Sequence, residues 1–247
     1  MAVEKHEVPS VWARPQRRQR EQPALSRAQI VAEAIRLLDT EGIAALSMRK
    51  LGAKLNAGAT SLYTHVANKD ELLELVTDEV FGELPTMSVP DPSRWRAATM
   101  RFGQELRATI LRHPWLAAVV GEVGTLYLGP NMMRVSNSVL ATLEAAGFTM
   151  EEADHAMNTV SSYVLGNATV EAASMIMVAR SGMDEVEWMR RLWPAAEAAA
   201  RPFPTVHKRY LVRPDEVANP RSRDESFIHE LGLILDGITP ATIGGRE

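Results

Sequence analysis

Apolar residues recur along most of this chain at the spacing of amphipathic helices. In the segment 27–40 an apolar stripe lies between Ser26, a favourable N-cap residue, and Gly42, which follows the last apolar position. The stripe consists of Ile30, Ala34, Leu37 and Leu38. Amphipathic segments at 47–55, 59–66 and 69–84 follow, the last of them after Asn68. The pattern predicts four helices in this part of the chain, the middle two joined by a short turn at 56–58.

The remainder of the chain has the same helical periodicity and no strand-like alternation. We expect helices at about 93–112, 115–121, 130–146, 150–179, 183–200 and 224–238, and a loop at 201–223, which is rich in proline and charge. Pro85, Pro90 and Pro92 mark a boundary between the two groups of helices. The predicted fold class is all-α, with a three-helix helix-turn-helix domain at 25–84 and a helical bundle at 85–247.

The stretch 46–69 has the composition of a helix-turn-helix unit that contacts DNA. Ser47 is a suitable N-cap for its first helix, and Leu62 and Val66 face inward from its second. The outward face of the second helix carries hydrogen-bonding side chains, as a helix that enters a DNA groove requires. Between 47 and 69 there are four cations and no acid, although the whole chain has a formal net charge of −4. Such a local cationic face suits phosphate docking; the alternative is a helical hairpin with a solvated basic face.

Residues 26–84 resemble the DNA-binding domain of regulators of the tetracycline-repressor (TetR) family. The resemblance rests on the helix at 30–38, the pair Glu41-Gly42, and the motifs Met48-Arg49-Lys50-Leu51, Ser61-Leu62-Tyr63-x-His65-Val66 and Asn68-Lys69-x-x-Leu72-Leu73. Weaker similarity extends to about residue 175 and includes His113 and the Ala146-Gly147-Phe148 turn. This second part is similar to the ligand-binding domain of the tetracycline repressor.

The resemblance implies a homodimer whose two recognition helices enter successive major grooves of a pseudo-palindromic operator. The residues it implies in DNA binding are Ser47, Arg49, Ala59, Thr60, Ser61, Tyr63, Thr64, His65 and Lys69. Of these, Arg49 and Lys69 match positions that contact the DNA backbone, whereas Thr60, Ser61 and Thr64 suit base edges. Tyr63 and His65 are expected to hold phosphates.

The helices near 150–179 and 224–238 are implied to form the dimer interface. In 224–238 the apolar side holds Phe227, Ile228, Leu231, Ile234 and Leu235. By periodicity alone such a helix belongs either to the core of its own subunit or to an interface, and the resemblance favours the interface.

A helical bundle of this kind also suits a small-molecule site. Our candidates for ligand binding are Phe102, Leu106, Trp115, Met133, Asn137, Ser161 and Asn167, with Tyr127, Met132, Asn158 and Tyr163 in a wider set. For each of them the alternative is an ordinary position in the core. The tetracycline repressor binds its drug as a magnesium chelate through a histidine and a glutamate. The matching positions here fall near the valines at 120–123 and at Val170, next to Glu171, so we expect no metal, no cofactor and a largely apolar ligand.

Composition removes several other classes of protein. The chain of 247 residues has no cysteine, which fits a reducing cytoplasm, and it has neither a membrane-spanning apolar run nor the apolar core of a signal peptide. Its six histidines lack metal-site spacing, and no nucleophile elbow or phosphate-binding loop is present, so we do not expect an enzyme. Residues 1–24 have the composition of a disordered basic arm, either a solvated tail or an arm that reaches a minor groove.

The sequence thus predicts a homodimeric DNA-binding repressor that a small ligand releases from its operator. Two alternatives stay open at this point. One is a regulator that activates transcription or responds to a protein partner, and the other is an interaction protein without sequence-specific DNA binding.

Overall fold

A computed structural model describes residues 25–88, 91–123, 129–211 and 220–240. Within these ranges the chain forms helices and connecting segments and contains no strand, so the all-α prediction is confirmed. None of the helices in the described ranges has the length and apolarity needed to cross a bilayer. The predicted basic arm at 1–24 and the candidate Tyr127 lie outside the described residues.

The head of the molecule comprises α1 (Arg27–Glu41), the 3₁₀ turn η2 (Ile43–Ala45), α2 (Met48–Lys54), α3 (Ala59–Tyr63) and α4 (Lys69–Phe81). Helices α1, α2 and α4 begin where a side chain accepts a hydrogen bond from a free amide of the first turn. Ser26 and Gln29 form a capping box on α1, Ser47 accepts from the Lys50 amide, and Asn68 accepts from the Glu71 amide. α3 ends at Tyr63, three residues before the predicted 66, and continues as a turn in which the amide of Val66 still donates to Leu62.

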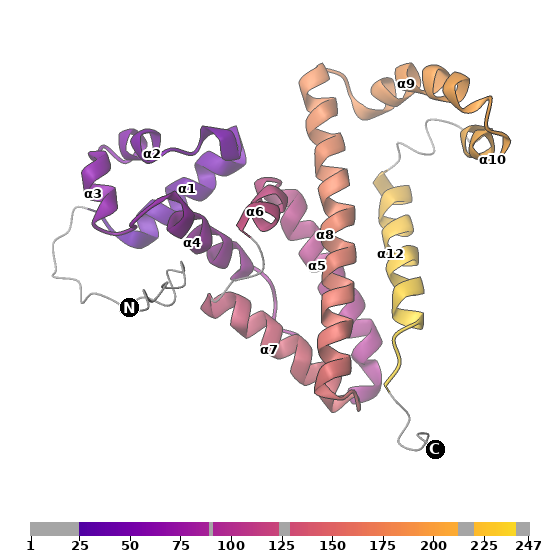
Figure 1. Cartoon of the computed structure of the whole chain (residues 1–247), viewed down its shortest axis with the longest axis horizontal. Helices are drawn as coiled ribbons and strands as arrows, with labels where there is room; N and C mark the ends of the chain where they lie inside the picture. Colours follow the sequence, from indigo (N-terminus) through magenta and orange to yellow (C-terminus); the bar gives the residue numbers. More distant parts are fainter. Residues whose placement is uncertain (1–24, 89–90, 124–128, 212–219, 241–247) are drawn as a thin grey trace, which may run out of the picture.

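The body begins with η3 (Pro92–Arg94), α5 (Trp95–Arg112) and α6 (Trp115–Val123), followed by α7 (Pro130–Ala145) and the long α8 (Met150–Ser181). It ends with α9 (Glu185–Ala200), α10 (Pro204–His207), the 3₁₀ turn η4 (Lys208–Leu211) and α12 (Pro220–Asp236). α5 and α8 pack along each other, and α12 runs beside both of them (Figure 1). Helix α3 lies at the end of the molecule remote from α8 and α12 (Figure 1).

One prediction for the C-terminal third is wrong. The segment 201–223 is not a continuous loop, because it contains α10, η4 and the first turn of α12. Pro204 and Pro220 occupy the first position of a helix, where a missing amide hydrogen costs nothing. These two prolines therefore begin helices within the segment expected to be a loop.

The apolar side of α12 belongs to the core of its own subunit. Phe227, Leu231 and Leu235 are no more than 2% exposed. A Cβ on Gly103 of α5 would lie 2.6 Å from Leu231 Cδ2, so the glycine allows α5 and α12 to approach closely. Of the predicted interface positions, Ile228 is 40% exposed and remains available to a partner.

Candidate DNA-binding face and effector cavity

The two helices of the DNA-facing unit are held together by an unusually close turn. A Cβ on Gly52 of α2 would lie 2.7 Å from the carbonyl oxygen of Ala57, so only glycine lets the turn fold back on α2. Asn56 accommodates the reversal with a positive φ of 50°. Leu51 and Leu62, both fully buried, then fix α2 and α3 against the head core. The sequence pattern predicted the turn at 56–58 but did not indicate the role of Gly52.

The outward face of α3 is open to solvent. Thr60, Ser61, Tyr63 and Thr64 are exposed, whereas Ala59 and His65 are half-buried. The Thr64 hydroxyl donates to the Ser61 carbonyl at 2.7 Å, so its hydrogen is already used within the turn. Thr60 and Ser61 make no such bond within the described chain, and their hydroxyl groups remain free to donate and accept. The two threonines are therefore not equivalent.

The cations of this face divide into two groups. Lys50 and Lys54 both pair with Glu41 at the end of α1, Lys54 at 3.5 Å. The hydrogen bond from Lys50 lowers the pKa of the Glu41 carboxyl. Arg49 and Lys69 are exposed and pair with no acid of the described residues. The predicted four-cation face is thus reduced to two unpaired charges, at the two positions that resemble backbone contacts, together with the exposed N-cap Ser47.

A cavity of about 600 Å³ lies between α4, α5, α7 and α8. The described residues that line it carry no charge, and its polar groups are one amide and three hydroxyls. The lining comprises Phe81, Phe102, Leu106, Met132, Met133, Val135, Ser136, Val139, Met157, Asn158, Ser161, Ser162 and Leu165. Three methionines give it adaptable walls. Phe81 is the last residue of α4, so the head itself forms part of the wall.

Four of the seven candidates for ligand binding line this cavity: Phe102, Leu106, Met133 and Ser161. Trp115 does not, because its Nε1 donates to Asp39 of the head at 2.7 Å. Asn137 lies on the exposed side of α7. Asn167 lines a second hollow instead. Phe81 and Met157 also line the cavity but were not among the candidates. The sequence places Phe81 in a helix of the head, and nothing in the sequence around Met157 distinguishes it from a core residue.

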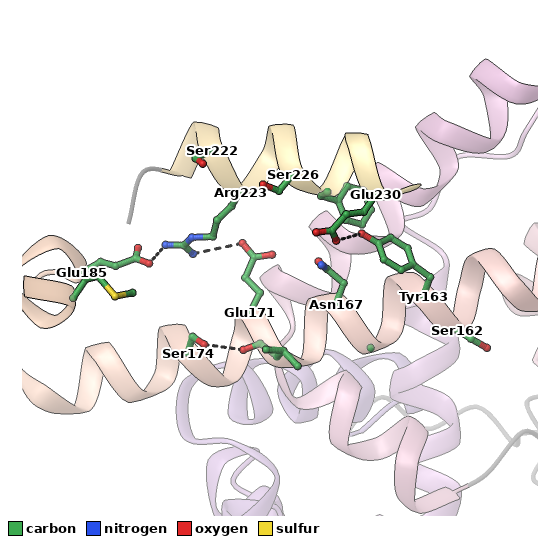
Figure 2. A pocket seen from close by; sticks show the side chains of 14 residues that line it. Ser162, Tyr163, Asn167, Glu171, Ser174, Glu185, Ser222, Arg223, Ser226 and Glu230 are labelled. Carbon is green, nitrogen blue, oxygen red and sulfur yellow. Dashed lines mark hydrogen bonds and ion pairs between the residues drawn. The ribbon is translucent and has the colours of Figure 1, made fainter. Parts of the chain in front are cut away.

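The second hollow is a groove of about 870 Å³ between α8, α9 and α12. Figure 2 shows that its polar side chains come from all three helices. Arg223 of α12 pairs with Glu185 of α9 and, at 3.6 Å, with Glu171 of α8. Tyr163 donates to Glu230 at 2.8 Å, and burial together with this bond raises the pKa of its hydroxyl. These pairs attach α9 and α12 to α8.

Glu171 already has a partner. Arg107 of α5 donates to both of its carboxylate oxygens, at 2.7 and 2.8 Å, in the two-pronged geometry that is strongest for this pair. The guanidinium of Arg107 also lies 4.9 Å from the centre of the Phe227 ring. Burial lowers the pKa of Arg107, but Glu171 and Asp224 outweigh it and raise the pKa. A carboxylate held in this way serves packing between helices.

Two family models match this chain. "Bacterial regulatory proteins, tetR family" covers residues 30–76, and "Tetracyclin repressor-like, C-terminal domain" covers residues 89–241. The second spans more than half of the chain. The chain belongs to the TetR family. It is therefore a helix-turn-helix transcriptional regulator that binds DNA, as the sequence predicted. The relatives that it matches are transcriptional regulators, not enzymes.

Similarity to individual proteins supports this assignment. An HTH-type transcriptional regulator of Saccharopolyspora erythraea is 44% identical over 165 residues, which cover 66% of this chain and 68% of that protein. The repressor DrrR1 of Streptomyces coeruleorubidus is 33% identical over 177 residues, 71% of this chain and 64% of the repressor. Among solved structures, ActR of Streptomyces coelicolor in complex with (S)-DNPA has a TM-score of 0.69 and 29% identity, covering 87% of this chain and 97% of ActR.

Proposed function

We propose that this regulator is a dimeric repressor that an uncharged, largely apolar effector releases from a pseudo-palindromic operator. One observation carries the proposal. The cavity is walled both by body helices and by Phe81, the last residue of the helix that starts beside the recognition helix. A molecule in the cavity thus contacts the head directly, so its affinity can differ between two positions of the head.

The chemistry of the cavity defines the effector class. A charged molecule would lose its hydration without finding a counter-charge among the described lining residues. A neutral molecule with one or two hydroxyl or carbonyl groups would bury its apolar surface against methionine and phenylalanine. Its oxygens would meet Ser136, Asn158, Ser161 or Ser162. Solved complexes of ActR with (S)-DNPA and with actinorhodin support a small-molecule site in this fold.

The dimer would form through the outer faces of α8 and α12. Val170 on α8 is 68% exposed, and Ile228 and Leu233 on α12 are 40% and 60% exposed. A two-fold contact through these faces would give each operator half-site one head. Deleting 224–247, the obvious test, would instead remove the core residues Phe227, Leu231 and Leu235. Point substitutions on the outer surface are needed.

The two unpaired cations of the head are expected to contact phosphates. Arg49→Ala or Lys69→Ala should weaken binding to specific and random duplexes alike, because each removes one contact per subunit. The slope of log affinity against log salt should fall by about 0.9 per lost contact, about 1.8 for a dimer. Lys208→Ala, an exposed cation of η4, is the control with the same charge change. Slopes equal to the control would contradict the assignment.

Thr60 is expected to read a base edge. Selection of duplexes from a random library should return a pseudo-palindrome for the unmodified protein, and Thr60→Ala should change its preference at one base pair per half-site by about 1–3 kcal/mol. Ser61→Ala should act similarly, and Thr64→Val less, because the Thr64 hydroxyl already donates to Ser61. Thr205→Ala on α10 serves as the control. An unchanged motif in all variants would show that α3 does not read bases.

The dimer is expected to depend on the exposed face of α8. Val170→Glu brings two carboxylates together across a two-fold axis and should raise the dimer dissociation constant at least tenfold, a change of about 1.4 kcal/mol. Sedimentation velocity at several concentrations measures this. Val206→Glu, 45% exposed on α10, should leave the dimer intact. Equal dimerisation of the two variants would place the interface elsewhere.

Effector binding is expected to need no metal. Nile red, a neutral apolar dye, should bind in the cavity and fluoresce equally with excess magnesium or excess chelator. Ser161→Trp fills the cavity and should weaken binding about tenfold or more, whereas Asn137→Trp, on the exposed side of α7, should not. Binding that chelator abolishes and magnesium restores would contradict this expectation and reveal a metal site.

A further inference from the structure

Helix α7 has no N-cap side chain of its own, and a residue of the head supplies one. Gly129 precedes the helix and Pro130 opens it, so neither offers a side-chain acceptor to the free amides. Asp78 of α4 fills this role. Its Oδ1 accepts from the amides of Asn131 and Met132, both at 3.0 Å, and its Oδ2 accepts from the Asn131 side chain at 3.2 Å. The carboxylate is 5% exposed, so these bonds lie where water screens little.

The glycine before α7 is required by this contact. A Cβ on Gly129 would lie 2.1 Å from Asp78 Oδ1, although the φ of −67° at this position suits any residue. The side chain is absent because the carboxylate occupies its place. Asp78 and the start of α7 thus fit each other closely enough that either one constrains the other.

A second contact runs in the opposite direction. Arg134, one turn into α7, directs its Nη2 at the backbone carbonyls where α4 ends, with distances of 3.4 Å to Phe81, 3.4 Å to Gly82 and 3.1 Å to Leu84. An acid of α4 therefore sits at the positive end of α7, and a base of α7 sits at the negative end of α4. Both placements are favoured by the helix dipoles. We name Asp78 with Arg134 and the backbone groups that they bind the α4–α7 clamp.

The clamp borders the effector cavity. Met132, whose amide Asp78 holds, lines the cavity, and Met133 follows it. Phe81, whose carbonyl Arg134 approaches, lines it from the α4 side. We propose that the α4–α7 clamp makes the two helices move as one body, so that displacement of the methionine wall by an effector reaches the head. This inference rests on the proposed function and assigns Asp78 and Arg134 as positioning residues for the response.

Other contacts join head and body but do not border the cavity. His113 lies between two head carboxylates, with its Nδ1 2.7 Å from Asp39 and its Nε2 3.2 Å from Glu83. Trp115 donates to the same Asp39. None of these four residues lines the cavity. They hold the head against the body away from the cavity, whereas the clamp joins the head to the cavity wall.

The test places an occupant in the cavity without any knowledge of the natural effector. Because the chain contains no cysteine, Ser161→Cys introduces a single thiol on α8, a helix outside the clamp, and N-phenylmaleimide attaches a ring there. Mass spectrometry gives the extent of labelling, and Ser161→Trp is a reagent-free occupant. The occupant is combined with Asp78→Asn, Arg134→Gln or the control Glu79→Gln, which makes the same charge change as Asp78→Asn on the exposed side of α4.

Two quantities are compared with and without the occupant. One is hydrogen exchange of the backbone amides of α1–α3, which needs no DNA. The other is affinity for the duplex that the unmodified protein selects from a random library. In the unmodified and Glu79→Gln backgrounds, the occupant should change head exchange and lower affinity by at least about fivefold, the lower end of usual couplings. In the Asp78→Asn and Arg134→Gln backgrounds, the occupant should lower duplex affinity by less than about twofold and leave head exchange nearly unchanged.

The possible failures are distinguishable. If the occupant acts equally in the Asp78→Asn and Glu79→Gln backgrounds, the clamp is not the connection and the inference is overturned, while the effector cavity stands. If the occupant acts in no background, the proposed effector cavity itself fails and the clamp with it. Asp78→Asn could also lower thermal stability. Such a loss would affect the labelled and unlabelled proteins alike, so it would not change the ratio of their DNA affinities, which is the quantity that the inference predicts.

Discussion

Helix α4 must be buried on almost every side, and the arrangement of the molecule follows from this constraint. Eight consecutive residues, from Glu71 to Asp78, are buried, because α1 covers one side of the helix while α6 and α7 cover another. Polar side chains in such a position need partners. Glu71 accepts from the amide of Ala67 and Asp78 from the amides of α7. The helix that starts beside α3 is thus hydrogen-bonded near its far end to α7, which lines the cavity.

Much of this fold could be predicted from the sequence, because short-range interactions determine where helices begin. Ser26, Ser47 and Asn68 cap the helices that they were expected to cap, because an N-cap bond joins residues only two or three positions apart. The long helix expected at 150–179 is observed at Met150–Ser181. The outward face of α3 is exposed as predicted. In each case the deciding interaction lies within a few residues of the position that it fixes.

Features that depend on contacts between residues far apart in the sequence could not be predicted. Periodicity predicted an amphipathic helix at 69–84 but gave no sign that α4 is covered on a second side. The cationic stretch contained no acid, yet Glu41 of α1 neutralises part of it. Trp115 appeared suitable for a ligand site, and Asp39, 76 positions away, holds its indole nitrogen. A single sequence does not record which residues meet across such separations.

The cavity imposes a further condition on effectors. A molecule that contacts only α5 and α8 binds equally well whatever the position of the head and shifts nothing, however tightly it binds. A molecule that also fills the space between Phe81 and the methionines of α7 gains contacts that depend on the position of α4. Affinity and release are therefore separate properties of a ligand here. In the proposed mechanism, the α4–α7 side of the cavity would govern release, and the α5–α8 side would contribute affinity alone.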